Sequence, residues 1–189
     1  SSDVCSSDLG ILAMNANGFL DPNGGGDGSQ LAGWCMSNGE GYGTHFAGEA
    51  YQRIELSENG LNCRIVPASD PVGEGTYSAA EFMPALIRDG EKLENQDWTG
   101  EQPRACFGAG DQGICMLVIE GRYPDEGIRG TSVNTCADIL LAYGCRNAIN
   151  MDGGSSAILW YDGEYVTQSS SVTLRYTGGR PLPNAWVYG

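Results

Sequence analysis

The sequence predicts an α+β fold: a single domain built on a mixed, mainly antiparallel sheet with few helices. Short apolar or alternating segments recur along the chain, and glycine-rich turns that suit hairpins separate them. Only one segment, 132–144, has a clear helical spacing of apolar residues. No internal repeat or linker interrupts the 189 residues, a length that suits one domain.

Three predicted hairpins supply much of the sheet. They lie at 51–57 with 61–67, within 104–121, and within 155–166, where the turn is Asp162-Gly163. The MLVI run of the second hairpin is wholly apolar, which predicts a central strand. Further strands are expected at 11–19, 146–152 and 183–189.

Two helices are predicted. In the segment 132–144, apolar residues recur at helical spacing and Gly144 supplies a C-terminal stop. Those apolar residues are Val133, Ala137, Leu140, Leu141 and, less regularly, Ile139. The second is a short helix at about 78–82, followed by an extended segment around Pro84.

The charge balance limits the partners. Ten Lys and Arg face 24 Asp and Glu, which gives a net charge of −14. A field this negative disfavours nucleic acid and anionic lipid, because neutralising phosphates needs clustered cations. No apolar run approaches the roughly 20 residues of a membrane span, so membrane insertion is not expected. A small anionic substrate stays compatible, because it responds to its local pocket.

The seven cysteines favour a location outside the cytoplasm. We expect six of them in disulfides, and therefore an extracellular or cell-envelope protein. Cys106 and Cys115 flank a predicted hairpin turn, so a disulfide between these two can be argued. With six cysteines in disulfides, Cys5 is the one left unpaired. The alternative is a set of scattered buried thiols. Residues 1–10, SSDVCSSDLG, are expected to be a non-native or disordered end.

The segment NMDGGSS is the strongest candidate site. A buried strand that runs into Asp-Gly-Gly places Asp152 at a strand end, where a side chain reaches a cleft. Gly153 and Gly154 allow positive φ and close approach of a ligand to backbone N–H groups. Ser155 and Ser156 add hydroxyl donors. The alternative interpretation is a plain tight turn.

Arginine is the preferred cation of this chain, with nine Arg against one Lys. This bias fits bidentate recognition of phosphate or carboxylate. Arg104, Arg122 and Arg180 stand at predicted strand ends or in a glycine-rich loop and are the candidates. The alternative is a set of solvated surface arginines.

His45 is the only histidine, so metal sites with two histidines are excluded. A Ser-His-Asp triad of His45 with Ser155 or Ser156 lacks the usual nucleophile elbow. Carboxylate chemistry beside arginines remains, and its candidates are Asp152, Glu120 and Asp111.

No cofactor and no metal site are expected. Asp21, Asn23 and Asp27 resemble the start of a calcium loop, but position twelve of that loop is Ala32 instead of a bidentate Glu. A glycine-rich turn explains the same residues.

The chain resembles the phosphodiester glycosidase family, which includes the catalytic domain of the uncovering enzyme, N-acetylglucosamine-1-phosphodiester α-N-acetylglucosaminidase, and bacterial relatives. The likeness spans about residues 11–189, and the family motifs stand in order. They are MNANGF (14–19), PRACFG (103–108), VIEGR (118–122), the helix with NAINMDGGSS (147–156), and GGRPLPNAWVYG (178–189). Strands that the family has upstream have no counterpart, which predicts an N-terminally incomplete domain.

The resemblance implies hydrolysis of the glycosidic bond of a sugar-1-phosphodiester on an envelope or extracellular glycan such as an exopolysaccharide. It assigns catalysis to Asp152, Arg104 and Arg122. It assigns substrate binding to Asn15, Glu120, Gly153, Gly154, Ser155 and Arg180. The competing hypothesis is a non-catalytic carbohydrate or cell-wall polymer binding module on the same fold, for which four Trp and nine Tyr supply stacking surfaces.

Overall fold

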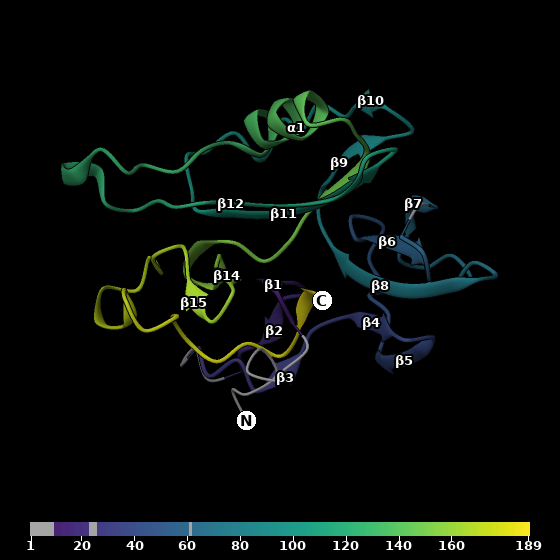
Figure 1. Ribbon diagram of the computed structural model, residues 1–189, viewed down its shortest axis with the longest axis horizontal. Coiled ribbons are helices and arrows are strands. Elements are labelled where there is room, and N and C mark those ends of the chain that lie inside the picture. The colour runs from purple at the N-terminus through teal and green to yellow at the C-terminus, as the bar shows by residue number, and fades with distance from the viewer. Residues whose placement is uncertain (1–9, 23–25, 61) are drawn as a thin grey trace.

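The computed structural model describes residues 10–22, 26–60 and 62–189 and shows three antiparallel sheets around a shared core (Figure 1). In that part of the chain there is one α-helix, so the fold is mostly β and not a balanced α+β mixture. The expected antiparallel sheet and single domain are confirmed. The predicted end at 1–10 lies outside the described residues, apart from Gly10.

The first sheet carries the helix on one face (Figure 1). Its strand order is β10 (Glu91–Lys92), β9 (Ala85–Arg88), β13 (Cys145–Asn150), β11 (Arg104–Gly110) and β12 (Gly113–Ile119), with α1 (Val133–Ala142) packed above. The second sheet has the order β5 (Glu40–Gly43), β4 (Trp34–Ser37), β8 (Thr76–Phe82), β6 (Gln52–Ser57) and β7 (Cys63–Pro67).

The third sheet brings the two ends of the described chain together. Its order is β15 (Glu164–Tyr165), β14 (Leu159–Tyr161), β1 (Leu12–Asn15) and β16 (Ala185–Tyr188). A separate pair is formed by β2 (Phe19–Leu20) and β3 (Gln30–Leu31), and short 3-10 turns occupy Pro124–Glu126, Gly154–Ser156 and Val172–Leu174. One apolar cluster joins all three sheets, for example through Met14, Ile54 and Phe107. Phe107 stacks on Trp186 with ring centroids 4.0 Å apart.

The helix and the three hairpins confirm the pattern-based predictions. Ser132 caps α1, because its Oγ accepts the N–H of Thr135 at 3.2 Å. Gly144 follows the helix with φ of +82°, which is the left-handed conformation expected of a helix stop. The buried face of α1 is formed by Val133, Cys136, Ala137 and Leu140.

The predicted helix at 78–82 is wrong, because these residues belong to β8. This strand lies between β4 and β6 and pairs with both of them. Ala79 and Ala80 have high helix propensity, but their small side chains fit a crowded central strand, and pairing on both edges overrides the local preference. The extended segment expected around Pro84 is confirmed by β9.

The placement of MLVI in a central strand is also wrong, since β12 lies at the edge of its sheet. The run is apolar because both faces of this edge strand are covered. Met116 and Val118 pack against the core shared by the sheets, whereas Leu117 and Ile119 pack against the cluster beneath α1.

The cysteines that the structure describes are free thiols. Cys106 lies opposite Leu117 and Cys115 lies opposite Gly108, so the two cysteines predicted to pair across the hairpin do not face each other. Cys5 lies outside the described residues. Burial raises the pKa of Cys106 well above its usual value, and its thiol is hydrogen-bonded to that of Cys136 on α1.

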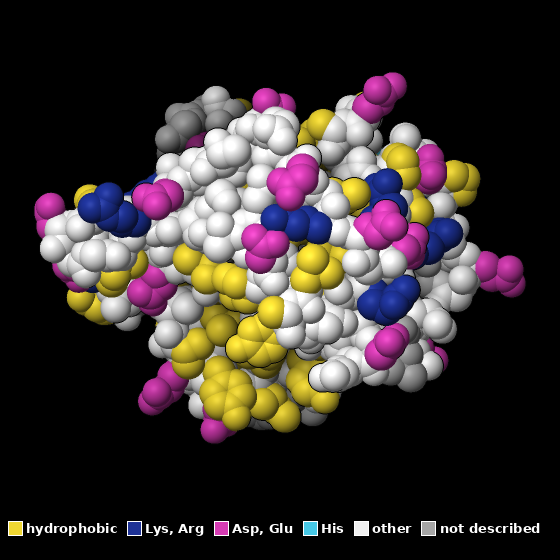
Figure 2. Space-filling view, turned by 90° about the horizontal axis from the view of Figure 1, so that it is seen from above, with side chains coloured by type: hydrophobic (Ala, Val, Ile, Leu, Met, Phe, Trp, Pro, Cys, Tyr) yellow, Lys and Arg dark blue, Asp and Glu magenta, His cyan; other side chains and the backbone are white. Residues whose placement is uncertain are grey.

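Figure 2 shows the face that carries α1, where Lys and Arg are interspersed with Asp and Glu. Within the described ranges, no helix has the length and apolar character needed to cross a membrane.

Candidate active site

The loop after β13 is fixed by backbone contacts with two other parts of the chain. The N–H of Asp152 donates to the carbonyl of Ala16 at 3.1 Å, and the N–H of Gly154 donates to that of Pro103 at 3.0 Å. A Cβ on Gly153 would lie 2.8 Å from the Pro103 oxygen, so this close approach requires glycine. The motif therefore holds Asp152 in a defined place between β1 and β11.

Asn15 stabilises the same loop from β1. Its Nδ2 donates to the carbonyl of Asp152 at 2.6 Å, and its Oδ1 accepts the N–H of Ile158 at 3.1 Å. The side chain is only 3% exposed. Asn15 was predicted to bind substrate, but both ends of its amide are bonded to backbone, so the structure gives it a positioning role.

We expect Asn15→Ala to lower the free energy of unfolding by about 2–4 kcal/mol, because two buried backbone groups lose their partners. Urea denaturation of both proteins measures this. An unchanged midpoint and slope would contradict the positioning role.

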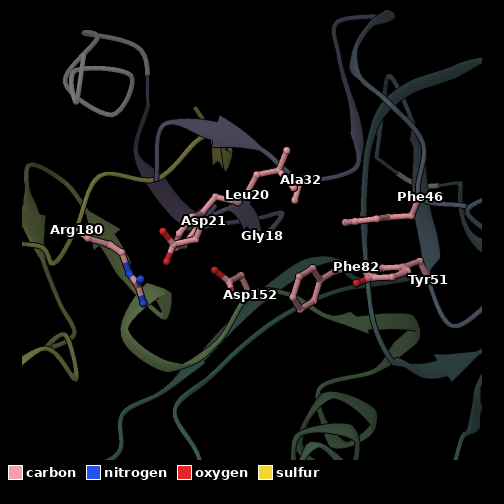
Figure 3. Close-up of a pocket in the computed structure, with 10 residues that line it drawn as sticks. Gly18, Leu20, Asp21, Ala32, Phe46, Tyr51, Phe82, Asp152 and Arg180 are labelled. Atoms are coloured by element: carbon pink, nitrogen blue, oxygen red, sulfur yellow. The ribbon is translucent and has the colours of Figure 1, made fainter. Parts of the chain in front are cut away.

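Asp152 lies in a pocket of about 370 Å³ (Figure 3). The pocket is bounded by three parts of the fold: the β1–β3 region, the second sheet, and the loops at 152 and 180. The lining residues are Gly18, Phe19, Leu20, Asp21, Ala32, Phe46, Tyr51, Phe82, Asp152 and Arg180. Of the residues singled out from the sequence, Asp152 and Arg180 line this pocket together, and so does Asp21, one of the calcium candidates.

The environment of Asp152 changes its acidity. Burial raises the pKa of the Asp152 carboxyl above its usual value, since the charged form loses water. The Ser156 hydroxyl, the Arg180 charge and the Gly153 N–H act in the opposite direction, because each stabilises the carboxylate. A half-buried carboxyl with a raised pKa is a stronger base than an exposed one.

Arg180 is fixed at the other end of the pocket. Its Nη2 donates to the Oγ of Ser155, and its Cζ lies 4.9 Å from the ring centroid of Phe19. Ser155, which was predicted to bind substrate, thus holds this guanidinium in place. The guanidinium of Arg180 carries further N–H groups, which can donate to an anion bound in the pocket.

Arg104 and Arg122 are not among the residues that line the pocket. Arg104 is buried and donates from Nε and Nη2 to the carbonyls of Thr131 and Gly100 at 3.1 and 2.9 Å. Arg122 is exposed and donates to Gln102 at 3.0 Å. Its guanidinium lies beside Gly154, within 3.2 Å of where a Cβ would stand.

The other sequence candidates, Glu120, Asp111 and His45, are not among the residues that line the pocket. Glu120 accepts the N–H of Gln168 at 2.7 Å and so fixes a neighbouring loop. Asp111 stands in the turn between β11 and β12, at the opposite end of β11 from Arg104. His45 lies 2.5 Å from Glu81 Oε1 and stacks on Trp34, so its bonded partner is a carboxylate and not a serine.

The predicted calcium residues are only partly described, because Asn23 lies outside the described residues. Asp21 accepts the N–H of Gly26, and Asp27 accepts the N–H and hydroxyl of Ser29, which also lowers the pKa of Asp27. Within the described ranges, no group of three or more His, Cys, Asp or Glu side chains is placed to hold a metal ion.

Sequence reasoning missed the aromatic residues of the pocket. Phe46 and Tyr51 stack with centroids 3.7 Å apart, and the ring of Phe82 lies against Gly18, where a Cβ would come within 2.9 Å. They come from one loop region and from β8, which the fold brings to the same hollow. The glycine of MNANGF was the available signal, since a missing side chain leaves room for a ring.

Comparisons with known proteins agree with this architecture. A sequence model of the phosphodiester glycosidase family matches residues 10–188, so the chain belongs to that family. A solved structure titled zebrafish N-acetylglucosamine-1-phosphodiester α-N-acetylglucosaminidase catalytic domain, auto-inhibited by its pro-peptide, is similar at a TM-score of 0.63 and 17% identity. A hypothetical protein from Synechocystis is similar at a TM-score of 0.60 and 16% identity.

These likenesses cover 94% and 97% of this chain but only 61% of the zebrafish chain and 52% of the Synechocystis chain. The chain therefore spans just over half the length of these structures. At such low identities they show the shared fold alone. No curated protein matches the sequence.

Proposed function

We propose that this protein hydrolyses the glycosidic bond of a sugar-1-phosphodiester. The observation that supports the proposal most is the joint presence of Asp152 and Arg180 in one pocket. The carboxyl has a raised pKa and the guanidinium is held by Ser155. A base beside a fixed cation suits an attack by water on a sugar carbon that carries a phosphate.

In this mechanism Asp152 accepts the proton of the attacking water. The leaving group needs no comparable acid, because a phosphate monoester has a second pKa of about 6 and departs as a stable anion. Arg180 binds the phosphodiester and stabilises the charge that grows on phosphate as the C–O bond breaks. Asn15 and Gly153 keep the base in place through the contacts described above.

The reaction is tested by incubating the protein with a sugar-1-phosphodiester and measuring free sugar and phosphomonoester together. Equal release of both products supports the proposal. Release of neither, at protein concentrations close to those of the substrate, contradicts it.

We expect the pH profile of kcat/KM to have an acidic limb set by Asp152. Activity needs the carboxylate, so it falls as the pH drops through the Asp152 pKa, which burial places above the ordinary value of 3.8. In Arg180→Gln the favourable charge is lost, so this limb moves to higher pH. A limb that stays in place in that variant would show that another group titrates.

A non-catalytic glycan-binding module on the same fold is the second candidate. What favours it is that Arg104 and Arg122, both predicted to be catalytic, are not among the residues that line the pocket. Calorimetric titration and turnover on the same sugar-1-phosphodiester separate the two: binding without product release supports the module.

The proposed location is the cell envelope or the exterior, with an envelope or extracellular glycan as the source of substrate. What supports this placement is the glycan substrate class of the family, because the cysteines that the structure describes are free thiols and supply no disulfide argument. Cell fractionation of the native host with an antibody to the protein tests it.

A further inference from the structure

The pocket is aromatic at one end and charged at the other, with Asp152 between them. In Figure 3, Phe46, Tyr51 and Phe82 lie on one side of Asp152, and Arg180 lies on the opposite side together with the carboxyl of Asp21. Arg180 is the one cation among the lining residues, so an anion that enters between the two carboxylates has only this guanidinium to bind. From this arrangement we infer the direction in which the substrate binds. The sugar ring packs at the aromatic end, and the phosphate meets Arg180. This inference rests on the proposed function.

The aromatic end suits a sugar because three rings line it, those of Phe46, Tyr51 and Phe82. Phe46 and Tyr51 form a stacked pair whose ring planes differ by 13°. Sugar rings present C–H faces that pack on such surfaces, and a charged phosphate loses solvation there without gaining a partner. The opposite orientation would place the phosphate against the three aromatic rings and would leave Arg180 facing the uncharged sugar.

The size of the pocket limits what is bound. A volume of about 370 Å³ is near the lower end of the range of small-molecule sites. It accommodates one monosaccharide and its phosphate. In the proposed orientation, the group on the far side of the phosphate lies outside this volume.

A buried charge cluster fixes the aromatic end. Glu81 is fully buried and accepts the backbone N–H groups of Phe46 and Trp34 at 3.0 and 3.1 Å. Arg53, also fully buried, lies 3.5 Å from the same carboxylate. A loop held by a buried carboxylate keeps the Phe46 ring in place before substrate arrives, which lowers the ordering cost of binding.

The orientation is tested by binding measurements in an Asp152→Asn background, which removes turnover. The probes are inorganic phosphate, methyl glucoside, glucose 1-phosphate and N-acetylglucosamine 1-phosphate. We expect Phe46→Ala to weaken the tighter-binding sugar 1-phosphate about tenfold and to leave inorganic phosphate within twofold. Arg180→Gln is expected to weaken inorganic phosphate and both sugar phosphates, with methyl glucoside unchanged.

Tyr42→Ala is the matched control, because Tyr42 is an exposed aromatic residue of β5, the strand that precedes the Phe46 loop, and does not line the pocket. It should change none of the four affinities. Equal weakening of inorganic phosphate and sugar phosphate by Phe46→Ala overturns the orientation, as does the absence of binding by either sugar phosphate. If the variants show the expected changes in affinity but the native protein shows no turnover, the proposed hydrolysis is refuted and the orientation stands. Turnover without these changes in affinity refutes the orientation alone.

Discussion

Asp152→Asn is expected to lower kcat for a sugar-1-phosphodiester by about 100- to 10,000-fold, the usual contribution of a general base. The amide has nearly the shape of the carboxyl but cannot accept a proton from water at neutral pH. The backbone contacts that hold this position involve the N–H and carbonyl of residue 152, which the substitution keeps. The fold and the affinity for substrate should therefore survive.

Asp162→Asn is the matched control. It makes the same chemical change in the exposed turn between β14 and β15, at a φ of +46° that asparagine tolerates. Its kcat should equal that of the native protein. If Asp152→Asn keeps more than a tenth of native kcat, Asp152 is not the base.

Arg180→Gln has the second largest expected effect. Removing a charge-assisted contact to a phosphodiester should raise KM about 10- to 100-fold, which corresponds to the roughly 1.5–3 kcal/mol of a hydrogen bond to a charged group. A further loss of kcat is expected, because the charge on phosphate grows as the C–O bond breaks. Initial rates over a wide substrate range separate the two effects.

Arg129→Gln controls for the change in net charge, because Arg129 is exposed and does not line the pocket. Steering of an anion by the whole protein would respond to both substitutions alike, whereas a local contact responds only at position 180. Equal KM values for the two variants would contradict the assignment of Arg180 to the phosphate.

Local patterns predicted α1 and the hairpins well, because the features that define them lie within a few residues of each other. The apolar spacing, the cap at Ser132 and the stop at Gly144 are all visible in one window. The strand β8 was missed for the opposite reason. Its conformation is imposed by pairing with β4 and β6, which a local window does not contain.

The candidate site was only partly predictable. Asp152 could be found because a strand end followed by two glycines is a local signal. Arg104 could not be placed, since a strand position does not say which face receives a side chain until the register is known. The register puts Arg104 on the same face of β11 as Cys106, the face that α1 covers. The aromatic residues were missed because the second sheet supplies them from a distance in sequence.

The most direct measurement is the fate of oxygen from labelled water. Hydrolysis of a sugar-1-phosphodiester is carried out in H₂¹⁸O, and the phosphomonoester is analysed by mass spectrometry. Attack at the sugar carbon, with Asp152 as base and phosphate departing beside Arg180, leaves the phosphomonoester free of the label and places it in the sugar. A labelled phosphomonoester would mean attack at phosphorus and would contradict a glycosidase mechanism.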